Sequence, residues 1–108
     1  MLLEVAILNI KQGRSDEFEQ SFSKASAIIS SMDGYIEHRL QKCIESPDQY
    51  ILLVQWESLE HHEIGFRQSE QYQEWKSLLH HYYDPFPVVE HYTEVYTQTA
   101  YGEEAQKK

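Results

Sequence analysis

Three side chains on predicted strands combine the chemistry of proton transfer with that of anion binding. His91 lies in an alternating run near the C-terminus, and His38 lies in an earlier run. A neutral imidazole held in a sheet can accept a proton from a bound substrate, because its ordinary pKa is close to physiological pH. Arg39 can neutralise the resulting anion. We therefore predict His91 and Arg39 as catalytic residues and keep His38 as a further candidate.

Each of these residues also has an ordinary structural explanation. A histidine in a sheet is often only a hydrogen-bonded part of the structure, and Arg39 can pair with Glu37 or with an acid on a neighbouring strand. Asn9, at the end of the first predicted strand, either binds a substrate oxygen or simply terminates that strand. The sequence leaves these alternatives open.

Aromatic residues form the second set of candidates, and we predict that they bind a flat ligand. They make up 13% of the chain, which includes eight tyrosines. Flat rings stack on planar molecules, although the same rings can merely close a hydrophobic core. Together with Asn9, the predicted substrate-binding residues are Trp56, Phe66, Tyr72 and Trp75.

The spacing of the histidines argues against a metal site. Four of the six form the adjacent pairs His61-His62 and His80-His81, and neighbours on a helix point about 100° apart. A metal-binding pair on a helix instead needs a spacing of three or four residues. The sequence also lacks a Gly-rich phosphate loop and a nucleophile elbow, so hydrolase and nucleotide-dependent functions lack support. We predict no metal and no other cofactor.

Charge and cysteine content limit the partners and the compartment. Nine basic and eighteen acidic residues give a net charge of -9, which repels phosphate backbones and anionic membranes. Cys43 is the single cysteine, so no intrachain disulfide can form, and the sequence contains no apolar run long enough to span a membrane. We predict no nucleic-acid partner, no membrane association and a cytoplasmic location.

The predicted strand over 49–57 organises the chain. Its stretch from Tyr50 to Trp56 is mostly apolar on both faces instead of alternating between apolar and polar residues. A chain of 108 residues can supply helices to cover one face of a sheet, so the second face needs another partner. We predict that a second copy of the chain covers it, which makes the protein a homodimer.

The predicted elements follow the order β-α-β-β-α-β, which is typical of a ferredoxin-like α+β fold with an antiparallel four-stranded sheet. The strands are predicted over 2–10, 35–42, 49–57 and 88–97. The helices are predicted over 15–34, 58–66 and 69–82, with Ser15 and Ser58 as N-caps and Ser69 at the start of the last helical piece. This domain covers residues 1–97, and residues 98–108 are predicted to be a mobile C-terminal tail.

The hairpin formed by the second and third strands fixes which side chains share a face. If it pairs symmetrically about its loop, one set is predicted to pack against the helices, namely Ile36, His38, Leu40, Ile51 and Leu53. The other set is predicted to form a cavity wall and comprises Tyr35, Glu37, Arg39, Leu52, Val54 and Trp56.

With this order of elements and the residues given below, the chain resembles the antibiotic biosynthesis monooxygenase family, whose members are small dimeric α+β barrel proteins. The likeness spans about residues 3–96. It rests on Gly34-Tyr35 with Arg39, on Tyr50 to Ser58, on Phe66 to Tyr72 with Trp75, and on Val88 to Tyr92. The resemblance implies a cavity on the concave side of the sheet, roofed by the second helix and lined by aromatic groups.

The resemblance also implies an activity. Some members oxidise phenolic or quinol-type substrates with O2 and without a metal or flavin, so we expect a cofactor-independent monooxygenase for a small aromatic or quinol-type substrate in a dimeric barrel cavity. A non-catalytic module that binds a small apolar molecule is the alternative. Haem degradation is a further one, although Ala6, Phe66 and Lys76 occupy the places of that subfamily's Asn, Trp and His, and His80 lies one turn further on.

Overall fold

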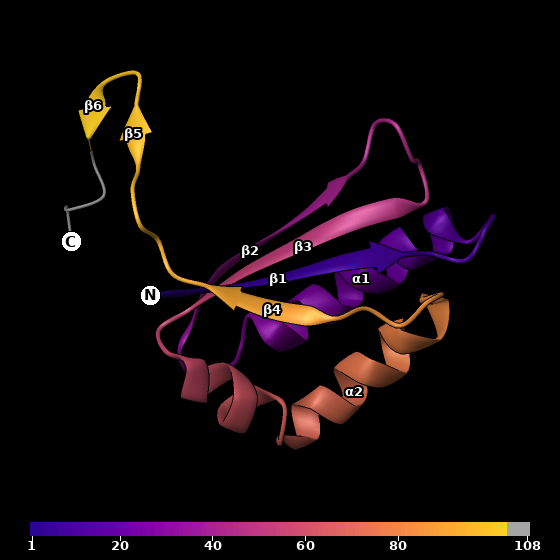
Figure 1. Cartoon of the computed structure of the whole chain (residues 1–108). Coiled ribbons are helices and arrows are strands. Elements are labelled where there is room, and N and C mark those ends of the chain that lie inside the picture. Colours follow the sequence, from indigo (N-terminus) through magenta and orange to yellow (C-terminus); the bar gives the residue numbers. More distant parts are fainter. Residues whose placement is uncertain (104–108) are drawn as a thin grey trace.

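The computed structural model describes residues 1–103 and contains one antiparallel four-stranded sheet with the strand order β2-β3-β1-β4. Both long helices, α1 and α2, lie on the same face of this sheet (Figure 1). The predicted ferredoxin-like α+β fold is therefore confirmed. The strands of the sheet are β1 (Leu2–Asn9), β2 (Tyr35–Lys42), β3 (Gln49–Trp56) and β4 (Val89–Tyr92). The helical elements are α1 (Ser15–Ile29), the π-helical η1 (His61–Phe66), α2 (Glu70–Leu79) and the short η2 (His80–Tyr82).

The two long helices begin in different ways. Ser69, which was predicted to start this helix, is the N-cap of α2, because its hydroxyl accepts a hydrogen bond from the backbone N–H of Tyr72 at 3.1 Å. Ser15 is instead the first residue of α1, and its hydroxyl donates to the carboxylate of Asp48. Both helices bury one apolar stripe, which in α1 consists of Phe18, Phe22, Ala25 and Ile29. Within residues 1–103, no helix is long and apolar enough to span a bilayer.

The register of the β2–β3 hairpin corrects the predicted assignment of the sheet faces. Symmetric pairing would have matched Lys42 with Gln49, but the Cys43 N–H bonds to the Gln49 carbonyl and Lys42 pairs with Tyr50. This difference of one residue reverses the faces of β3 relative to β2, because alternate side chains point to opposite faces. The helix-facing residues of the hairpin are consequently His38, Leu40, Tyr50, Leu52, Val54 and Trp56, whereas Arg39, Ile51 and Leu53 lie on the open face.

β4 is shorter than predicted and ends at Tyr92. Tyr92 pairs with Leu3, and β1 begins at Leu2, so the residues after Tyr92 have almost no backbone of β1 left to pair with. The chain then leaves the sheet and leads to a small hairpin of β5 (Gln98–Thr99) and β6 (Gly102–Glu103), which stands away from the body (Figure 1). The predicted tail thus starts with this hairpin. The domain boundary at residue 97 and the mobility of the tail remain predictions, and residues 104–108 lie outside the described residues.

The open face of the sheet carries a row of apolar side chains. Ile7 of β1 is 41% exposed, and Tyr92 of β4 is 50% exposed. Around them, the cross-strand pairs of β1 with β3 and β4 add Leu3, Val5, Ile51 and Leu53 to the same face. Because α1 and α2 both lie on the other face, this surface is the apolar, uncovered face of the sheet that the sequence predicted.

The packing predicts a large stability cost for Trp56→Ala. The indole is fully buried between the sheet and the helical layer, so its removal leaves a cavity and should lower the free energy of unfolding by about 3–5 kcal/mol. Urea unfolding measures this loss. Ile44→Ala in the exposed hairpin loop is the control and should change the value by no more than about 0.5 kcal/mol. Equal effects from both changes would contradict the described packing.

Candidate functional site

A cavity of about 280 Å³ lies between the helix-covered face of the sheet and the helical layer. Its floor is formed by side chains of β1, β3 and β4, among them Ala6, Leu52 and Val89. Its roof comes from η1, α2 and the segment that follows η2. The volume is close to the lower end of the range for small-molecule sites, so the cavity suits a ligand of about one or two rings. It is formed by a single chain and does not lie between two sheets.

Aromatic rings dominate the roof of this cavity. The ring of Phe66 meets Tyr72 and Trp75 edge to face, with centroid distances of 5.2 and 5.6 Å. Further along, the chain passes from α2 to Tyr83 and Phe86, whose rings complete this part of the lining. The structure therefore brings three predicted substrate-binding residues, Phe66, Tyr72 and Trp75, to one cavity. Their contact with a substrate remains a prediction.

A buried carboxyl group lies at the floor. Glu4 is 6% exposed on β1 and shares a face with Ala6 and Leu8, which also line the cavity. Its Oε1 accepts a hydrogen bond from the indole Nε1–H of Trp56 at 2.9 Å. Trp56, which was predicted to bind substrate, does not line the cavity. It lies behind Glu4 and supports the carboxyl group through this hydrogen bond.

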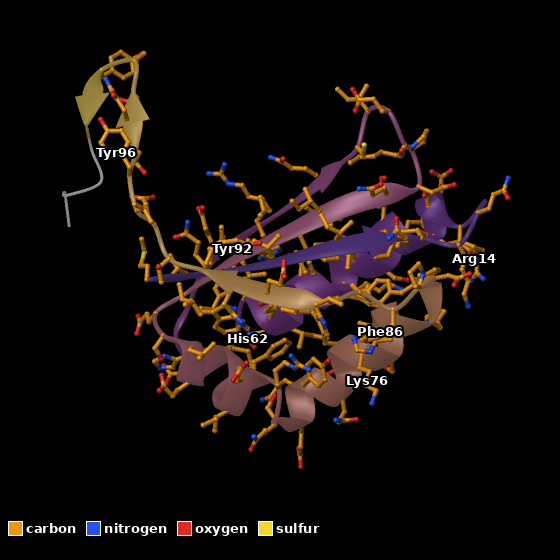
Figure 2. All side chains as sticks on the ribbon, viewed as in Figure 1. Arg14, His62, Lys76, Phe86, Tyr92 and Tyr96 are labelled. Carbon is orange, nitrogen blue, oxygen red and sulfur yellow. The ribbon has the colours of Figure 1, made fainter. Side chains whose placement is uncertain are left out.

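Two histidines extend from this carboxyl group. His62 is 2% exposed, and its Nε2 lies 3.3 Å from Oε1 of Glu4. Its other ring nitrogen, Nδ1, lies 2.8 Å from Nε2 of His91, which is half-buried on β4. Figure 2 shows His62 on the helix side of β4 and Tyr92 on its opposite side. His91 thus reaches the site through His62 and does not line the cavity itself.

Burial makes the Glu4–His62 pair favour its uncharged form. Desolvation raises the pKa of Glu4 to about 7, although the Trp56 hydrogen bond and the charge of Arg67 act in the opposite direction. Desolvation lowers the pKa of His62, and the charges of His91 and Arg67 lower it further. The 3.3 Å contact between the two groups therefore brings together a neutral imidazole and a carboxyl group that shares its proton near neutral pH, and it is not a buried ion pair. Glu4 is suited to accept and return a proton near neutral pH.

Arg67 supplies the positive charge at this cavity. Its side chain is exposed at the rim, and its guanidinium lies 5.7 Å from the centroid of the Tyr72 ring. The lining imidazole of His80 carries no charge near neutral pH, because burial, aided by Lys76 and Arg67, lowers its pKa to about 4. Burial likewise raises the pKa of the Tyr83 phenol. An anionic ligand in the cavity would therefore interact with Arg67.

The size and the donors of the site bear on metal and haem binding. In residues 1–103, no group of three or more His, Cys, Asp or Glu side chains is arranged to hold a metal ion. His80 is the histidine nearest to the place of a haem ligand, but its ring packs against Phe86 with the centroids 4.9 Å apart. A cavity of about 280 Å³ does not offer room for a tetrapyrrole beside it.

Two predicted site residues lie elsewhere, and the structure corrects their placement. Arg39 is on the open face with its side chain 65% exposed, and it lies 3.5 Å from Glu37. Asn9, also on the open face, lines a shallow depression beside the β2–β3 loop. The physical reason is the alternation of side chains along β1 and β2, which points both residues away from the helices. His38 bonds to Ser26 and Tyr35, which accounts for it structurally.

Glu4, His62 and Arg67 line the cavity but are not among the site residues predicted from the sequence. A signal for Glu4 was present, since an acidic residue interrupts the apolar run of β1 on the same face as Ala6 and Leu8. His62 gave no such signal, because its partner His91 is 29 residues away in the chain.

The comparisons with known proteins establish the class of this protein. The chain belongs to the antibiotic biosynthesis monooxygenase family, whose model matches residues 1–78. It is 56% identical over 95 residues to the uncharacterized protein YczJ of Bacillus subtilis (strain 168), an alignment that covers 88% of this chain and all of the relative.

Solved structures agree with this assignment. A crystal structure from Bordetella bronchiseptica that carries the same family name has a TM-score of 0.83 and 32% identity, and the match covers 87% of this chain and 96% of that one. SnoaB of Streptomyces nogalater, described as a cofactor-independent oxygenase, has a TM-score of 0.69 and 17% identity, with 92% of this chain and 95% of that one covered. The likeness to SnoaB shows the shared fold.

The raised pKa of Glu4 predicts a pH-dependent effect of Glu4→Gln. Between the ordinary pKa of 4.5 and the folded value of about 7, the folded state binds more protons at Glu4 than the unfolded state does. The contribution of Glu4 to the free energy of unfolding must then fall as pH rises through this window. Glu4→Gln removes this titration, so the stability of the variant relative to the parent should increase by about 1–3 kcal/mol between pH 5 and pH 8.

Chemical unfolding at several pH values tests this difference. The matched control is Glu60→Gln, because the Glu60 carboxylate is exposed to water in the folded state. Its stability difference from the parent should stay nearly constant over the same range. A Glu4→Gln difference that is equally flat would show that the buried carboxyl group does not hold its proton on folding.

Proposed function

We propose that this protein is a cofactor-independent monooxygenase that acts on a small aromatic or quinol-type substrate of one or two rings. The observation that supports this most directly is Glu4, a buried carboxyl group with a pKa of about 7 that faces an aromatic-lined cavity. Family membership and the fold shared with SnoaB, a cofactor-independent oxygenase, add support. Phe66, Tyr72 and Trp75 hold the flat substrate in this proposal, since their rings line one side of the cavity.

The proposed reaction balances without an external reductant. A naphthalene-1,4-diol and O2 give a hydroxynaphthoquinone and water, so one oxygen atom bonds to a ring carbon and the other leaves as water. The substrate supplies all four electrons. Glu4 takes the phenolic proton as a carboxylate, which makes the ring electron-rich enough to reduce O2, and it returns the proton to the departing oxygen. Arg67 at the rim offsets the charge of the phenolate.

A homodimer belongs to the same proposal. The open face presents Ile7, Leu53 and Tyr92, and the chain beyond Tyr92 continues as an exposed arm in which Val95 is 95% exposed. A second copy placed over this face would bury the apolar row and give the arm a surface to pack against. The cavity lies on the other side of the sheet, so each subunit would keep its own site. We further propose the reducing cytoplasm as the compartment, where Cys43 would stay a free thiol.

Oxygen uptake with naphthalene-1,4-diol tests the activity. We expect uptake above the rate of spontaneous oxidation, and with 18O2 we expect one labelled atom in the quinone and one in water. Glu4→Gln should lower kcat by about 10²- to 10⁴-fold, because it removes the proton acceptor and keeps the shape of the side chain. The exposed Glu60→Gln is the control and should retain the rate.

Two arginine variants then separate the structural assignment from the sequence-based one. Arg67→Gln should raise KM for the diol, whereas Arg39→Gln, on the opposite face, should leave KM unchanged. If a panel of phenols and quinols gives no oxygen uptake while an apolar ligand raises the melting temperature, the non-catalytic binding module replaces the enzyme. A Soret shift on adding haem would favour haem degradation.

The dimer is tested by Ile7→Asp. A carboxylate in the middle of the open face would be buried without a partner on association, so the dissociation constant should rise by at least about 100-fold. Analytical ultracentrifugation at micromolar concentration measures this change. Ile64→Asp, exposed on η1 at the helix side, should leave the mass of the dimer unaltered. A parent protein that sediments as a folded monomer would contradict the proposal.

A further inference from the structure

We infer that Glu4, His62 and His91 form a proton-transfer chain from the cavity to the edge of the sheet, in which both imidazoles exchange tautomers when Glu4 gains or loses its proton. Only the catalytic use of this proton-transfer chain rests on the proposed function. Its existence is inferred from the positions of three side chains from β1, η1 and β4, which the fold brings together.

The contacts are consecutive and use different atoms. Oε1 of Glu4 lies 3.3 Å from Nε2 of His62, and Nδ1 of His62 lies 2.8 Å from Nε2 of His91. The second distance is that of an ordinary hydrogen bond, whereas the first is slightly long and would shorten during proton transfer. His62 is 2% exposed, but His91 is only half-buried on the edge strand β4. The proton-transfer chain therefore runs from a buried carboxyl group to a half-buried histidine on the edge strand.

The chemistry of imidazole makes the two contacts depend on each other. A neutral imidazole has one nitrogen that donates and one that accepts. When Glu4 is a carboxylate, His62 donates from Nε2 to Glu4 and accepts at Nδ1 from Nε2–H of His91. When Glu4 is protonated, it donates to Nε2 of His62, whose Nδ1–H then donates to Nε2 of His91. A proton that enters at one end therefore moves each hydrogen one step along, and both rings stay neutral.

The neighbouring groups favour this neutral relay. Arg67, which follows η1, opposes a positive charge on His62 and favours the ionised form of Glu4, and burial also disfavours a charged His62 ring. Trp56 of β3 bonds to the same oxygen of Glu4, but indole is only a donor, so it fixes the carboxyl group without passing a proton. Tyr83, after η2, remains a neutral phenol because burial raises its pKa. Arg67, Trp56 and Tyr83 therefore do not compete as proton carriers.

The proton-transfer chain would connect Glu4 with the solvent when a ligand occupies the cavity. A flat ligand that fills the cavity separates Glu4 from water on the cavity side, while Glu4 must still reach the carboxylate form that begins the proposed reaction. His62 and His91 provide this route from behind the carboxyl group. In the proposed reaction they are positioning and relay residues, since neither needs to touch the substrate.

Nitrogen NMR on the full-length protein with 15N-labelled histidine tests the chain without any substrate. Between pH 6 and pH 8.5, we expect the ring hydrogen of both His62 and His91 to move from Nδ1 to Nε2, with a common midpoint. Glu4→Gln should abolish this exchange, because the amide does not titrate. The exposed His81→Gln should leave it unchanged. The proposed proton-transfer chain is wrong if either ring keeps one tautomer throughout, if the two midpoints differ, or if His62 becomes a cation.

A kinetic measurement tests the catalytic use of the chain. With naphthalene-1,4-diol, His91→Gln should lower kcat by about tenfold to a hundredfold at unchanged KM, and added imidazole should restore part of the rate. A merely structural role would not respond to imidazole, so unrestored kcat overturns the relay. Tautomer exchange without oxygen uptake would support the chain and overturn the proposed function. Oxygen uptake without tautomer exchange would do the reverse.

Discussion

The burial of one carboxyl group in an apolar sheet is the constraint on which the rest of the site depends. A carboxylate taken out of water is costly unless it is protonated or hydrogen-bonded, and Glu4 meets both conditions in part. Trp56 and His62 contact the same oxygen, so the positions of two large side chains follow from one acidic residue. The cavity lies directly over this group, which places its proton where an aromatic ligand would bind.

The helical layer is anchored so that this arrangement holds. Gly34 has a φ of 82°, and a Cβ atom there would collide with the ring of His61 at the start of η1. That close approach, together with the hydrogen bond between Ser58 and His61, fixes the outer histidine of the pair. His62 then turns inward and stacks on Trp56 at 5.3 Å, with 21° between the ring planes. Glycine is thus required for packing as well as for its backbone angle.

The two faces of the sheet serve different purposes. The helix-covered face encloses the cavity and its ionisable groups, while the open face carries apolar side chains and the root of the C-terminal arm. Successive side chains of a strand point to opposite faces of the sheet, so Arg39 and His38 are neighbours in the sequence yet lie on opposite sides. Family membership accounts for the shared scaffold, and the particular ionisable groups that this chain places in it carry the functional argument.

The sequence by itself determined the order of the elements, the start of α2 and the excess of apolar surface on the sheet. These depend on local periodicity, capping and composition, which can be read along the chain. Only the tertiary structure decided the register of the β2–β3 hairpin, the early end of β4 and the meeting of Glu4, His62 and His91. Those features arise from contacts between residues that are not neighbours in the sequence, and local patterns do not specify which strand positions pair.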